Sequence, residues 1–105
     1  MAFSRAPWSS PESDLDANDF CAVCLIDANP PGQPKIKGNC KLPVKSTPGG
    51  PTSIPGMHAA AVVLAGGRGG VSAPSSLKKQ AARKLIRLYQ QAGEVPPDSL
   101  RRVAG

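Results

Sequence analysis

The clearest pattern of hydrophobic and polar positions in this chain lies between residues 75 and 92. Apolar side chains recur there at helical spacing, and lysine, arginine and glutamine fill many of the other positions, as in a helix with one buried face. Pro74 is tolerated in a first helical turn, and Gly93 is a typical residue just beyond a helix end. The pattern predicts an amphipathic helix over residues 75–92, with an apolar stripe of Leu77, Ala81, Ala82, Leu85, Ile86, Leu88 and Tyr89.

A second helix is expected over residues 57–65, where Pro55 lies near the start and Gly66 follows the end. This segment is apolar nearly all round, which predicts burial on more than one side. The glycine-rich residues 66–73 form a flexible connector. We therefore expect the two helices to pack as an antiparallel hairpin, followed by a last short turn after Pro97.

The part of the chain before the helices predicts short strands and loops. Residues 21–26 are an apolar run of strand length, and residues 40–44 could form a second strand, which Pro43 restricts to a sheet edge. The segments 27–39 and 45–56 are dense in Pro and Gly and are expected to be loops. The whole chain is therefore predicted to be mostly α with a small irregular β portion.

Residues 1–20 are expected to form an extended N-terminal arm, because prolines, serines and aspartates disfavour regular structure there. Three spaced aromatic residues interrupt the arm. They could anchor it on another surface, or they could fold back onto the chain's own core. The predicted organisation is an arm over 1–20 and one small α+β domain over 21–105. The three aromatic residues are Phe3, Trp8 and Phe20.

Only one other aromatic residue, Tyr89, occurs among the 105 residues. The core must therefore be built mainly from Ala, Val, Leu and Ile, and a small domain of this kind buries little apolar surface. We expect the fold to be completed by docking onto a partner. No apolar run approaches the roughly 20 residues that cross a bilayer, so no membrane partner is expected. The polar, acidic N-terminus is not expected to be a secretion signal.

The net charge of +6 hides an uneven distribution. Five acidic residues lie within residues 1–27, whereas residues 28–93 contain ten basic residues and no acidic one. The helix at 75–92 has five bases and lacks the mixed signs of an ordinary exposed helix. We expect this face to meet something negative: the acidic arm of a neighbouring copy, an acidic protein surface, or DNA. The five bases are Lys78, Lys79, Arg83, Lys84 and Arg87.

Three cysteines are an odd number, which argues against a secreted disulfide framework and favours free thiols in a reducing compartment. A Cys₃His zinc site is one interpretation of their spacing, because thiolates are good zinc ligands. The other interpretation is that the cysteines are small hydrophobic residues in a buried strand, and it is the one we favour. We therefore expect no metal and no cofactor. The zinc set would consist of Cys21, Cys24, Cys40 and His58.

No complete catalytic set is evident. His58 is the only histidine, and no Asp or Glu lies within thirty residues of it in the sequence. General-base catalysis would need an orienting carboxylate and a nucleophile close by. The glycine-rich run at 66–70 lacks the spacing of a phosphate-binding loop. The sequence predicts that the chain is not an enzyme.

From Lys41 to Leu100 the order of motifs resembles a small domain of head proteins in tailed bacteriophages and prophages. The matching features are a KLP edge, a Pro-Gly-Gly turn, an Ala-rich helix ending in LAGGRGGV, the helix KKQAARKLIRLYQQAG and a closing PPDSL. In that group the domain is appended to prohead proteases and minor head proteins, or stands alone. This chain lacks the protease domain, and the N-terminal arm is outside the shared pattern.

The resemblance implies a structural virion protein, either a capsid decoration protein or a minor capsid protein. It implies location in the virion and, during assembly, in the host cytoplasm. Its partner would be the major capsid protein or another head protein, and copies of the chain could also contact one another. The alternative is a basic nucleic-acid-binding accessory protein that uses the 75–92 helix. The residues expected to contact the partner are Phe3, Trp8, Phe20, Arg83, Lys84 and Arg87.

Overall fold

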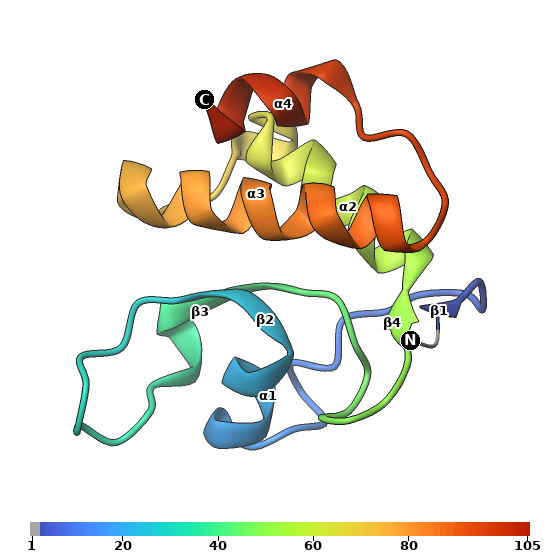
Figure 1. Cartoon of the computed structure of the whole chain (residues 1–105). Helices are drawn as coiled ribbons and strands as arrows, with labels where there is room; N and C mark the ends of the chain where they lie inside the picture. Colours follow the sequence, from blue (N-terminus) through green and yellow to red (C-terminus); the bar gives the residue numbers. More distant parts are fainter. Residues whose placement is uncertain (1–2) are drawn as a thin grey trace.

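The computed structural model describes residues 3–105, without the side chain of Arg68 (Figure 1). Four α-helices and short strand pairs form one unit, which confirms the predicted mostly α fold with a small β portion. Among the described residues no helix is long and apolar enough to cross a membrane. The elements are β1 (Phe3–Ser4), α1 (Ala17–Val23), β2 (Cys24–Asp27), η1 (Lys37–Asn39), β3 (Cys40–Pro43), β4 (Thr52–Ser53), α2 (Ile54–Leu64), η2 (Gly67–Gly69), α3 (Ser75–Gln91) and α4 (Asp98–Ala104).

The helices α2, α3 and α4 lie together on one side of the molecule (Figure 1). Helix α2 begins at Ile54, three residues before the predicted start, because the Ser53 hydroxyl caps it by accepting a hydrogen bond from the Gly56 amide at 3.0 Å. Its nearly continuous apolar sequence is explained by burial between α3, α4 and the strands: Met57, Ala60, Ala61 and Leu64 are all buried.

Helix α3 confirms the predicted amphipathic helix, with Ala81, Ala82, Leu85 and Tyr89 buried along one face. It ends in the expected way, because Gly93 adopts a φ of +75° and lets the Glu94 amide donate to the Tyr89 carbonyl at 2.9 Å. The expected short turn after Pro97 is longer than predicted: it is helix α4, which lies against α3.

The predicted strand at 21–26 is wrong in its first half, because α1 includes Cys21 to Val23. The Asp16 carboxylate caps this helix by accepting from the Asp19 amide at 2.8 Å. Phe20 and Val23, three residues apart, then share one buried face. The strand begins at Cys24 and pairs antiparallel with β3, which confirms the second predicted strand.

Residues 5–16 contain no helix or strand, as expected for the arm, but this segment packs against the rest of the chain, and residues 17–20 begin α1; Met1 and Ala2 lie outside the described residues. Strand β1 pairs in parallel with β4, and Phe3 packs against the main core. The ring of Trp8 lies against α2, where a Cβ on Gly56 would be 3.0 Å from Trp8 Cε2. Phe20 is only 2% exposed. These aromatic residues supply apolar area that the Ala-rich core lacks. The expectation that the fold is completed only by docking onto a partner stays a prediction.

Candidate functional site

The most distinctive surface is a group of exposed cations on the neighbouring helices α3 and α4, which we call the basic face. Among the residues whose side chains are described, no carboxylate lies within ion-pair distance of any of them. All are exposed, whereas Lys78 is partly buried and lies on the side of α3 that carries the buried Ala82 and Leu85. Arg83 is held in place because its Nε donates to the Ala104 carbonyl at 3.2 Å. The basic face consists of Lys79, Arg83, Lys84, Arg87, Arg101 and Arg102.

One edge of the basic face borders a hollow of about 340 Å³ between α3 and β2, which we call the Lys84 groove. Leu25 and Leu88 contribute its apolar side chains, and Lys84 and Arg87 contribute two cations. A surface of this kind suits a partner that offers apolar side chains flanked by negative charge. The predicted contact residues Arg83, Lys84 and Arg87 are therefore brought together on one exposed surface.

The three predicted aromatic anchors do not lie on this surface. Phe20 is buried in a small cluster with Cys21, Val23 and Cys40, so its prediction as a partner anchor is wrong. Phe3 and Trp8 are half-buried against the chain itself, as the alternative of folding back requires. The physical reason is that the chain's own apolar surface is the nearest partner for its aromatic side chains.

A second and larger hollow, of about 510 Å³, lies between α2 and the segment that joins α3 to α4. Its rim carries Val62 and Val95, which are 49% and 82% exposed. His58 Nε2 lies 2.8 Å from Glu94 Oε1, and Arg5 donates to the other carboxylate oxygen at 3.2 Å. The hydrogen bond with His58, followed by that with Arg5, lowers the pKa of Glu94 against the raising effect of burial.

Glu94 thus supplies a carboxylate beside His58, although no Asp or Glu lies within thirty residues of His58 in the sequence. Ser99 lines the same hollow, but none of the hydrogen bonds among residues 3–105 joins Ser99 to His58. A serine nucleophile depends on such a contact with its base. The arrangement therefore gives an oriented histidine but not an activated hydroxyl. No signal in the sequence pointed to the pair, because its members are 36 residues apart.

The expectation of three free thiols is wrong, because Cys21 and Cys40 form a disulfide. Helix α1 and the β2–β3 pairing bring the two Cα atoms to 5.3 Å. Cys24 remains a free thiol. Burial first, and then the charges of Glu12 and Asp27, raise the pKa of Cys24 to about 12. Cys24 is therefore protonated near neutral pH and is a poor nucleophile and metal ligand.

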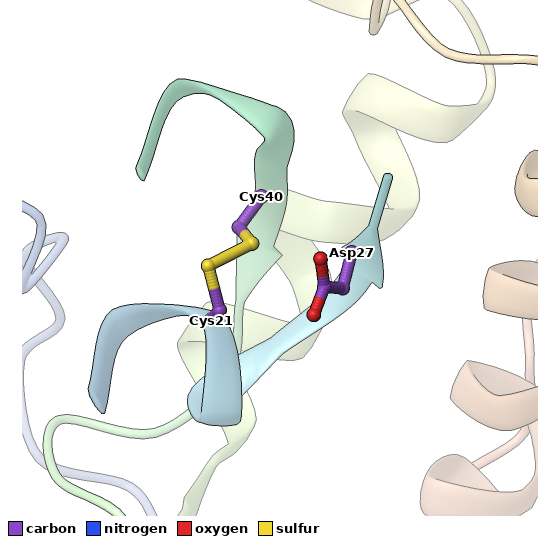
Figure 2. Close-up of side chains that lie close together, drawn as sticks. All are labelled: Cys21, Asp27 and Cys40. Atoms are coloured by element: carbon purple, nitrogen blue, oxygen red, sulfur yellow. A yellow bond between two sulfur atoms is a disulfide. The ribbon is translucent and has the colours of Figure 1, made fainter. Parts of the chain in front are cut away.

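The predicted zinc set is not assembled, because His58 lies beside Glu94 and is not among the residues clustered around the disulfide. Asp27 takes its place: its carboxylate and the sulfur atoms of Cys21 and Cys40 lie within 4.8 Å of one another (Figure 2). The two sulfurs are bonded to each other and are not thiolates. The chemistry of this cluster in the disulfide state is that of a structural cross-link.

In comparisons with protein-family models, curated proteins and solved structures, nothing matches this chain.

Proposed function

We propose that the chain is a non-enzymatic structural protein of a virion, a decoration or minor capsid protein that binds the major capsid shell of a tailed phage. The observation that carries the proposal is the ordered set of motifs between Lys41 and Leu100, which resembles a domain of phage head proteins. That stretch includes β4, α2, α3 and most of β3, which form one packed unit with the start of α4.

The exposed charge supports a binding role on a large surface. The basic face offers exposed cations from two packed helices, and two of them, Lys84 and Arg87, line the Lys84 groove. Single contacts of this kind are weak because exposed charges are screened by water and salt. A shell repeats the same binding site many times. If neighbouring bound copies also contact each other, these contacts strengthen the retention of every copy on the shell.

The test is binding of the purified chain to empty shells assembled from the major capsid protein of the phage or prophage that encodes it. We expect the chain to cosediment with the shells at saturable stoichiometry, and the double variant Lys84→Glu/Arg87→Glu to lose most of this binding. Lys41→Glu/Lys45→Glu is the matched control, because it changes the net charge equally outside the basic face. Absence of binding by the unmodified chain would refute the proposal.

A second candidate function is supported by the same basic face, whose cations have no carboxylate partner among the described side chains. A nucleic-acid-binding accessory protein would use these cations against phosphates, and its affinity would fall steeply with added salt. Equal and strongly salt-dependent binding to unrelated DNA duplexes, without binding to shells, would favour this candidate over the first.

A further inference from the structure

The two signs of charge gather on different elements of the molecule. Four exposed carboxylates lie in the turn before α1 and in its first turn, and we call them the acidic end. Figure 1 shows α1 on one side of the β2–β3 hairpin and α3 with α4 on the other. Strands β2 and β3 therefore lie between α1 and the helices that carry the basic face within one copy. The acidic end consists of Glu12, Asp14, Asp16 and Asp19.

Neither charged surface is neutralised within the chain. Among the described side chains the ion pairs are Arg5 with Glu94, His58 with Glu94, and Lys35 with Asp27, and none includes the acidic end or the basic face. Lys37 approaches the acidic end but donates to the backbone carbonyl of Glu12, at 2.7 Å. Both surfaces thus remain available for an external partner.

We propose that the basic face of one copy binds the acidic end of a second copy, head to tail. This inference goes beyond the proposed shell binding, because it is a property of the chain in solution. The two surfaces are complementary in sign, and complementary potentials steer association and fix its orientation. A second copy is the one partner whose acidic surface is described here.

The Lys84 groove indicates what kind of contact this is. Its two cations, Lys84 and Arg87, are exposed, whereas Leu25 is a core residue with 9% exposure and Leu88 is partly buried. Leu15, between Asp14 and Asp16 in the acidic end, packs against the chain's own small cluster around Phe20. The contact is therefore mainly electrostatic, with carboxylates of one copy paired with cations of the other.

The arrangement has a consequence for the assembly. Because the two surfaces are different and are separated by β2 and β3, a pair joined through one such contact still presents one free basic face and one free acidic end. Head-to-tail contacts of this type build rings or open chains rather than closed dimers. The net charge of +6 on every copy opposes association, so we expect a weak contact in dilute solution that increases with protein concentration.

The experiment measures the size distribution of the full chain by sedimentation velocity at low ionic strength over a range of concentrations. We expect species larger than a monomer that dissociate when salt is added. Two variants reverse one surface each: Lys84→Glu/Arg87→Glu on the basic face, and Glu12→Lys/Asp14→Lys at the acidic end. Each alone should associate at least about tenfold more weakly than the unmodified chain. All four side chains are exposed, and thermal melting checks that both variants remain folded.

Mixing the two variants is the decisive step, because each keeps the surface that the other has lost. The equimolar mixture should recover larger species, and the control Lys41→Glu/Lys45→Glu should associate like the unmodified chain. A chain that stays monomeric at all concentrations, or a mixture that stays monomeric, would overturn the inference. So would a monomeric chain whose basic face binds duplex DNA.

Shell binding separates this inference from the proposed function. The acidic-end variant retains the whole basic face, so it should bind capsid shells even where it no longer binds other copies. If it fails to self-associate yet binds shells, both proposals stand. If the unmodified chain binds shells but never self-associates, only the head-to-tail contact is refuted.

Discussion

The helical part of the molecule, from α2 to α4, and the lobe formed by α1, β2, the loop 28–39 and β3 are stabilised in different ways. The helices share one large apolar cluster, in which Met57, Leu85 and Leu100 are completely buried, and the lobe contributes only one face of β2 and β3 to it. The lobe adds a second cluster of only four buried residues and is closed by the disulfide. A region with too few apolar residues is thus fixed by a covalent bond and by polar contacts.

Asn29 is the polar centre of that lobe. Its Nδ2 donates to Asp27 Oδ1 at 2.8 Å and to the Cys40 sulfur at 3.3 Å, while its Oδ1 accepts from the Ile36 amide at 2.8 Å. One amide side chain therefore connects β2, the disulfide and the end of a proline-rich loop. Side-chain hydrogen bonds order this segment, whereas the helices depend on apolar packing.

The largest expected effect comes from the helical core. The Leu85 side chain is completely buried, so Leu85→Ala leaves a cavity in the core and should lower the free energy of unfolding by about 2–5 kcal/mol. Leu77→Ala on the same helix is the control, because Leu77 is only partly buried, and it should cost clearly less. Urea denaturation followed by circular dichroism measures both. Equal losses would show that the apolar cluster does not dominate this part.

Removal of the disulfide should have the next largest effect, and a local one. Closing a loop with a sequence separation of 19 residues corresponds to about 3 kcal/mol in the chain-entropy model. In Cys21→Ala/Cys40→Ala, we expect amides of α1 and the loop 28–39 to lose protection from hydrogen exchange while those of α3 keep theirs. Cys24→Ala, which removes the free thiol, should leave α1 protected. Simultaneous loss of protection in α1 and α3 would show one cooperative unit instead of two.

The sequence predicted the helical part well, for a physical reason. The helices α2 and α3 are determined by contacts between residues three or four positions apart, and such periodicity is visible in a single sequence. The end of α3 was predictable too, because Gly93 adopts the left-handed conformation that glycine tolerates best. The exposure of Arg83, Lys84 and Arg87 was predictable in the same way, because they lie on the polar side of a periodic helix. Their contact with a partner stays a prediction.

The lobe and the N-terminal segment were predicted poorly because their contacts are distant in sequence. The link between Cys21 and Cys40 depends on α1 and on the pairing of β2 with β3, which three cysteines alone do not reveal. Parallel pairing of Phe3 with Thr52, and the approach of His58 to Glu94, leave no periodic signal either. Helix α1 has seven residues, too few for a helical pattern to outweigh an apolar run of strand length.

Acidification compares the two parts through one carboxylate in each, Asp27 in the lobe and Glu94 beside the helices. Burial alone would raise the pKa of Asp27, but hydrogen bonds from Lys35 and Asn29 lower it below its usual value. The pKa of Glu94 is also lowered, by hydrogen bonds from His58 and Arg5. A lowered pKa in the folded state means that the stabilisation is present at neutral pH and is lost as the pH falls below about 4 and through the folded value.

The expected losses are small, below about 1 kcal/mol for each carboxylate, because both pairs are partly exposed to solvent. Asp27 accepts three hydrogen bonds and Glu94 two, so Asp27→Asn should remove more of the acid dependence than Glu94→Gln. Thermal melting between pH 7 and pH 3 measures the slope for each variant and for the unmodified chain. If Glu94→Gln flattened the profile more than Asp27→Asn, polar contacts would contribute more beside the helices than in the lobe, and the contrast between the two parts would fail.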